Sequence, residues 1–135
     1  MSVGLLLITH NDIGASLLET ATQMLGRCPL RAETLAVTND AARDLLALEA
    51  QRMARDLDSG HGVLVLTDLF GASPANIANA LDARGGLCVL AGLNLSMLVR
   101  VLNYPDLPLA AMAEKALSGG REGVLTCSRR EREAQ

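Results

Sequence analysis

Short, mostly apolar segments recur along this chain, and amphipathic segments fill the intervals between them. The apolar segments span residues 3–8, 30–37, 63–67, 87–91 and 124–127. Apolar residues occupy nearly every position of the first segment, not every second one, which is typical of strands covered by helices on both faces. The alternation predicts an α/β fold: a three-layer sandwich with a mostly parallel central sheet.

The chain length predicts one domain. Half of the 135 residues are apolar, which suffices to bury one core but not two ordinary ones. We expect a domain over residues 1–128 and a polar tail over 129–135. A net charge of −3 without a basic tract argues against nucleic acid as a partner.

The start of the chain resembles neither a leader nor a membrane anchor. It has no basic region, and its apolar run is far shorter than the roughly 20 residues that span a bilayer. We expect a cytoplasmic protein that is not membrane-embedded. Three widely spaced cysteines, Cys28, Cys88 and Cys127, indicate reduced thiols, with neither a disulfide framework nor a metal site.

Helical patterns occupy the intervals, over residues 13–25, 40–57, 95–102 and 108–117. Asp40 is a good N-cap for the second of these. Another helix is expected to start with Ser73 as its cap and Pro74 in the first position, where the missing N–H of proline costs nothing. Gly119 and Gly120 are expected to follow the end of the last helix.

Two polar residues follow strands that belong to the same rim of the predicted sheet. His10 ends the first strand and Asp68 ends the third, and ligands of open parallel sheets bind at such strand ends. A carboxylate beside a histidine fixes the proton on one ring nitrogen and leaves the other as a nucleophile near neutral pH. The alternative is that His10 merely lies in a turn or caps the next helix.

The segment after Asp68 leads through Gly71 and Ala72 into the helix at Ser73. A helix start presents unpaired N–H groups and attracts anions, phosphate in particular. We therefore expect Gly71, Ala72 and Ser73 to bind a phosphoryl group. The alternative is an ordinary strand-end turn with Ser73 as an ordinary cap, and a single glycine is weak evidence for a phosphate loop.

Two further segments favour structural roles. Residues 92–98 indicate a turn into an amphipathic helix, in which Met97 and Leu98 pack. His61 lies between two glycines before a strand, at the opposite rim of the predicted sheet, and is expected to be a solvated turn residue.

Three motifs carry a family resemblance: LLITH at 6–10, DLFGASPAN at 68–76 and GLNL at 92–95. In this order they resemble the mannose-type IIA components of the bacterial sugar phosphotransferase system, and the resemblance extends from residue 3 to about 125. It implies a phosphotransferase whose His10 accepts a phosphoryl group from the carrier HPr and passes it to a IIB component for sugar uptake. It further implies that Asp68 holds His10, that the Ser73 hydroxyl lines the phosphoryl site, and that no metal or organic cofactor is required.

The resemblance also implies a homodimer, in which residues 124–127 join the partner's sheet as an antiparallel strand. The chain departs from the family pattern at Asn11-Asp12, where glycine is common, and at Ser96, where proline is common. Asparagine tolerates left-handed backbone geometry, so Asn11 is expected to preserve the turn. Asp12 adds negative charge near an incoming phosphate.

Several alternatives stay open for the acceptor and the role. We expect a separate IIB protein as acceptor, and an association with a membrane transporter complex is compatible with this role. A regulatory protein of an incomplete phosphotransferase system would instead use phospho-His10 to control a partner. A dihydroxyacetone kinase subunit shares the active histidine, although the 68–76 segment argues against it. The remaining alternative is a small-molecule-binding domain without phosphorylation.

Overall fold

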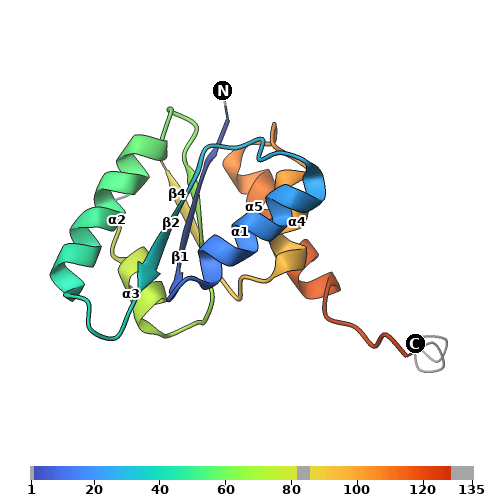
Figure 1. Ribbon diagram of the computed structural model, residues 1–135. Helices are drawn as coiled ribbons and strands as arrows, with labels where there is room; N and C mark the ends of the chain where they lie inside the picture. The colour runs from blue at the N-terminus through green and yellow to red at the C-terminus, as the bar shows by residue number, and fades with distance from the viewer. Residues whose placement is uncertain (1, 82–85, 129–135) are drawn as a thin grey trace.

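The computed structural model describes residues 2–81 and 86–128 (Figure 1). Its strands and helices alternate along the chain, as an α/β fold requires. The strands are β1 (Gly4–His10), β2 (Ala32–Val37), β3 (Val63–Thr67) and β4 (Leu87–Ala91). The helices are α1 (Ile13–Leu25), α2 (Arg43–Leu57), α3 (Ser73–Asn79), α4 (Leu95–Leu102) and α5 (Leu109–Glu122).

The sheet has the order β2-β1-β3-β4, and each neighbouring pair is parallel. From β1 the chain moves to β2 on one side, and it then crosses to β3 on the other side of β1. The strand order therefore reverses between β1 and β3. In open parallel sheets this reversal opens a crevice at the carboxyl ends of the two strands.

Helices cover both faces of the sheet: α1, α4 and α5 lie on one face, and α2 and α3 on the other (Figure 1). Successive side chains of β1 point to opposite faces, so Leu5 and Leu7 belong to one core cluster while Leu6 and Ile8 belong to the other. All four side chains are fully buried. This explains the unbroken apolar run and confirms the predicted three-layer sandwich.

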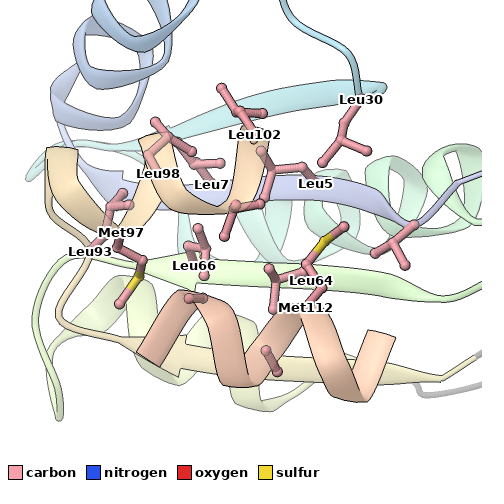
Figure 2. Close-up of a cluster of buried hydrophobic side chains, with 14 of the residues drawn as sticks. Leu5, Leu7, Leu30, Leu64, Leu66, Leu93, Met97, Leu98, Leu102 and Met112 are labelled. Atoms are coloured by element: carbon pink, nitrogen blue, oxygen red, sulfur yellow. The ribbon is translucent and has the colours of Figure 1, made fainter. Parts of the chain in front are cut away.

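The larger core lies beneath α4 and α5 (Figure 2). Leu64 and Leu66 of β3 pack there with Leu98 of α4 and Met112 of α5. Each of these side chains is fully buried, and such burial stabilises the fold by about 1.5–3 kcal/mol per side chain.

The last helix continues beyond its predicted end. It runs through Gly119 and Gly120 to Glu122, so the prediction that these glycines follow the helix is wrong. A Cβ at Gly119 would lie 2.5 Å from Cβ of Arg100 on α4. The glycine serves the close approach of two helices instead of ending one.

Two predicted helix starts are also wrong. The second helix begins at Arg43, after Ala42, and not at an Asp40 cap. The third helix begins with Ser73 itself, after Ala72. Ser73 is therefore the first helical residue instead of the cap, and Pro74 follows it in the first turn.

The C-terminal part of the described chain leaves the domain as an irregular segment (Figure 1). The predicted strand at 124–127 is not formed within its own chain, whose described strands are all parallel. Antiparallel pairing with a second copy stays a prediction. The predicted tail, 129–135, lies outside the described residues. None of the helices in the described ranges is long and apolar enough to cross a membrane.

Candidate functional site

The His10 and Asp68 side chains meet at the crevice between β1 and β3. Oδ2 of Asp68 lies 2.8 Å from His10 Nδ1 and also accepts the His10 backbone N–H at 3.1 Å. His10 is the last residue of β1, and Asp68 directly follows β3, which pairs with β1. The pairing of these two residues, predicted from the sequence, is confirmed.

The carboxylate is more enclosed than the imidazole. The Asp68 side chain is 12% exposed and the His10 side chain 38% exposed. The other carboxylate oxygen, Oδ1, is buried and has no hydrogen-bond partner in the described residues. The one oxygen of Asp68 with hydrogen-bond partners in the described part of the chain, Oδ2, thus contacts His10, where a carboxylate can stabilise positive charge on a ring.

The contact with Asp68 fixes the chemical role of each ring nitrogen. A carboxylate can only accept a hydrogen bond, so Nδ1 of a neutral His10 carries the proton. Nε2 then keeps its lone pair. Nε2 is therefore the ring nitrogen that can act as a nucleophile.

The turn after His10 is fixed by local contacts. Asn11 has a positive φ of 47°, which confirms the left-handed geometry expected there, and its N–H donates to Val37 O at 3.0 Å. Thr9 Oγ1 accepts the Gly14 N–H at 2.8 Å. A Cβ at Gly14 would lie 3.1 Å from this hydroxyl. These contacts join the end of β1 to α1 and hold the His10 backbone in place.

A cavity of about 100 Å³ adjoins the imidazole. Ser73 lines it, as predicted for a phosphoryl site. Further lining comes from the segment after β2 and from the start of α2, and it includes Thr38, Asn39 and Arg43. Sequence reasoning missed these three residues. The sequence carried no direct signal for them, because they reach this rim only through the strand order, which places β2 beside β1.

Gly71 and Ala72 shape the approach to Ser73. Gly71 has a φ of 81°, in the region that glycine adopts without strain, and the Ala72 N–H donates to Leu69 O at 3.3 Å. The segment thus forms a tight turn between β3 and α3. Binding of a phosphoryl group by Gly71, Ala72 and Ser73 stays a prediction.

Large apolar side chains are exposed beside the site. Phe70 is 85% exposed and Leu69 60% exposed, both directly after Asp68. Ile13, three residues after His10, is also exposed. Exposed aromatic and aliphatic groups beside a polar site are typical of surfaces that bind other proteins.

The other two sequence candidates have structural roles. Asn94 Oδ1 accepts the Met97 N–H at 2.8 Å, and its amide donates to Gly120 O at 3.1 Å. This residue caps α4 and joins it to α5, while Met97 and Leu98 are buried. His61 is exposed just before β3, at the rim opposite His10. Both expectations are confirmed.

The resolved pKa shifts lie outside the cavity. The hydrogen bond from Arg52 lowers the pKa of Glu49, and the same contact raises the pKa of Arg52. Arg52 also pairs with Asp56 at 2.9 Å. Burial raises the pKa of the Cys88 thiol, with a smaller contribution from the Glu114 charge. These groups stabilise or pack the domain and do not contact His10.

The fold and site define a class: an α/β domain that presents a carboxylate-held histidine at the switch point of a parallel sheet. Residues 4–116 match the family described as the PTS system fructose IIA component, where PTS is the sugar phosphotransferase system. The chain belongs to this family. Its relatives include mannose-specific members, in agreement with the resemblance noted in the sequence.

Two curated relatives are each 32% identical to the chain. One is the mannose-specific EIIAB component of the PTS from Escherichia coli K12, which aligns with 92% of this chain and 39% of its own length. The other is the transcriptional regulatory protein LevR of Bacillus subtilis, which aligns with 82% of this chain and 12% of its own length. The chain therefore spans well under half of either relative.

Solved structures share the fold over nearly the whole chain. The mannose/sorbose-specific IIA subunit from Enterococcus faecalis has a TM-score of 0.81 at 25% identity, covering 95% of this chain and 96% of that one. The EIIA component from Streptococcus agalactiae has the same TM-score at 23% identity, covering 93% of this chain and 98% of that one. A sigma-54 interaction domain protein from Enterococcus faecalis has a TM-score of 0.76 at 15% identity, covering 90% of this chain and 93% of that one.

Proposed function

We propose that this protein is a phosphohistidine carrier: His10 accepts a phosphoryl group from phospho-HPr and passes it to a IIB component for sugar uptake and phosphorylation. The observation that carries the proposal is the 2.8 Å contact between His10 Nδ1 and Asp68 Oδ2. This contact leaves Nε2 as the nucleophile at the rim of the sheet. We assign the carrier domain to residues 1–128 and its place of action to the cytoplasm.

In the proposed reaction, the Nε2 lone pair of His10 attacks the phosphorus of phospho-HPr. A bond forms between Nε2 and phosphorus, while the bond to the donor's histidine nitrogen breaks and its electron pair returns to the donor ring. The His10 ring becomes positively charged, and its Nδ1 proton stays hydrogen-bonded to Asp68. The Ser73 hydroxyl and the N–H groups around Gly71–Ser73 stabilise the transferring oxygens. The step requires no metal or organic cofactor.

The exposed residues beside His10 support a protein as the donor. Leu69 and Phe70 give the rim an apolar contact surface, and aromatic residues are enriched where proteins dock. HPr and the IIB component are expected to bind there in turn, since each must reach the same nitrogen.

We further propose that the protein forms a homodimer through residues 124–127. Val124 is 79% exposed and Leu125 is also exposed in the single chain, although both are apolar. Pairing of this segment with the sheet of a second copy would bury them and supply the antiparallel strand that the family resemblance implies. The segment follows α5 without returning to its own sheet (Figure 1).

A regulatory role is the second candidate function, and the similarity to LevR favours it. In this role phospho-His10 would control the binding of a partner, with no onward transfer. Pull-downs with the phosphorylated and unphosphorylated protein separate the two roles. A carrier loses its phosphoryl group to a IIB component, whereas a regulator retains a partner in one phosphorylation state only.

Incubation with phosphoenolpyruvate, enzyme I and HPr tests the proposed function. We expect one acid-labile phosphoryl group per chain, and we expect it to be absent from His10→Ala. His61→Ala is the matched control, because His61 is exposed at the opposite rim, and it should label normally. Label that survives His10→Ala, or that is lost only in His61→Ala, contradicts the proposal.

A further inference from the structure

Part of the lining of the His10 cavity comes from residues outside the predicted phosphoryl-binding loop, and it includes one cation. Thr38 and Asn39 follow β2, and Arg43 begins α2; all three line the cavity with His10 and Ser73. In the described part of the chain, Arg43 is the single Lys or Arg among the lining residues. The cavity therefore combines a nucleophilic imidazole, a hydroxyl and a guanidinium.

The position of Arg43 is unfavourable for the stability of α2. It is the first residue of that helix, and the positive end of the helix dipole disfavours a cation there. The Arg43 side chain makes no hydrogen bond or ion pair within residues 2–81 and 86–128, whereas the Arg52 side chain on the same helix pairs with Glu49 and Asp56. An exposed cation without a side-chain partner is available to bind an anion in the adjoining cavity.

We infer that Arg43 binds the phosphoryl group while it is carried on His10 Nε2, an inference that rests on the proposed function. A guanidinium matches the oxygens of a phosphoryl group with parallel N–H donors and keeps its charge at all relevant pH values. The cavity volume of about 100 Å³ exceeds the roughly 10–15 Å³ that one water requires. It has room for phosphoryl oxygens, and both Ser73 and Arg43 line it.

The charges around the transferring phosphoryl group explain the role of Arg43. Asp68 stabilises the positive ring during transfer but repels the anionic phosphoryl oxygens. Arg43 supplies the opposite charge on the side of those oxygens and exchanges no proton or electron. It thereby stabilises the charge of the transferring group in the same way as arginines of other phosphoryl-transfer sites.

Two phosphoryl donors of different size test this inference. One is phospho-HPr, and the other is phosphoramidate, a small donor without a protein surface. With phosphoramidate the phosphorus–nitrogen bond breaks, ammonia leaves with the electron pair, and the Nε2–phosphorus bond of His10 forms. If Arg43 binds the phosphoryl group, Arg43→Gln slows labelling by both donors about tenfold or more. Arg43→Lys should recover part of the rate, because it keeps the charge but not the paired donors.

The matched control is Arg55→Gln, which removes the same charge from the last turn of the same helix. Labelling of this variant should equal that of the parent protein. The two variants should also differ in their stability to urea. Arg43→Gln is expected to unfold at the same or higher urea concentration than the parent, and Arg55→Gln at a slightly lower one. If Arg43 had only a structural role, Arg43→Gln would unfold at a lower urea concentration than the parent.

Each contrary outcome has one meaning. If Arg43→Gln slows transfer from phospho-HPr but not from phosphoramidate, Arg43 contacts the protein donor, and the inference is overturned. Equal labelling of Arg43→Gln and the parent by both donors also overturns it, and leaves the proposed function intact. If neither donor labels His10 in the parent protein, the proposed function fails and the inference fails with it.

Discussion

Oδ2 of Asp68 contacts His10 twice, at 2.8 Å from ring nitrogen Nδ1 and at 3.1 Å from the backbone nitrogen. One carboxylate oxygen thus fixes both the orientation of the ring and the end of the strand that carries it. The sheet makes this possible, because β1 and β3 are parallel neighbours and end at the same rim.

Asp68→Asn tests how much this contact contributes to the rate of phosphoryl transfer. The substitution keeps the size of the side chain but removes the charge that stabilises the positive ring, and its amide can pair with the wrong tautomer. We expect transfer from phospho-HPr to slow by one to several powers of ten, each about 1.4 kcal/mol of barrier. Rapid-quench measurement of phospho-His10 formation gives the rate.

Asp12→Asn is the matched control for Asp68→Asn. Asp12 is an exposed carboxylate two residues after His10, and its removal takes negative charge away from the incoming phosphate. Transfer should be unchanged or faster. Equal rates for Asp68→Asn and the parent would show that Asp68 is only a loop residue.

Asn11 tests the turn that follows the nucleophile. Its φ of 47° costs most residues about 1–2 kcal/mol but costs glycine little. Asn11→Ala should therefore lower the free energy of unfolding by about 1 kcal/mol, while Asn11→Gly should leave it nearly unchanged. Urea denaturation measures both. Equal free energies of unfolding for Asn11→Ala and Asn11→Gly would contradict a left-handed turn at this position.

Gly119→Ala tests the contact between α4 and α5. In an ordinary helix interior this change stabilises by roughly 1 kcal/mol. Here the new Cβ would lie 2.5 Å from Cβ of Arg100, so the helices must move apart. We expect a net loss of about 1–3 kcal/mol in unfolding free energy. A variant as stable as the parent would mean that the two helices separate at no cost.

Val124→Asp tests the proposed dimer. Analytical ultracentrifugation should give a dimer for the parent protein and a monomer for the variant, because a charge in an apolar strand interface is costly. Leu48→Asp is the control, since Leu48 is 66% exposed on α2, away from the segment at 124–127. A parent protein that is monomeric at micromolar concentration contradicts the proposed assembly.

The four strands of the sheet and the His10–Asp68 pair could be predicted because strong local signals specify them. Apolar runs mark strands buried on both faces, and a parallel sheet brings its strand ends to one rim. The sequence even indicated the backbone geometry of Asn11, since few residues adopt that region.

The missed features depend on contacts between distant segments. Gly119 and Gly120 resemble a helix stop until Arg100 and Met97 are placed against them. Asp40 and Ser73 are good caps locally, yet Ala42 and Ala72 occupy the two cap positions. Arg43 joins the site through the strand order, which places β2 beside β1, and no motif near Arg43 encodes that order.

The central claim is that Asp68 holds Nδ1 of His10 and thereby directs phosphoryl transfer to Nε2. The most direct test is phosphorus and nitrogen NMR of protein labelled with ¹⁵N-histidine and phosphorylated by phospho-HPr. We predict one phosphorus signal, coupled to Nε2 of His10, with Nδ1 protonated. A phosphorus bonded to Nδ1 of His10, or to a nitrogen of His61, would contradict the account.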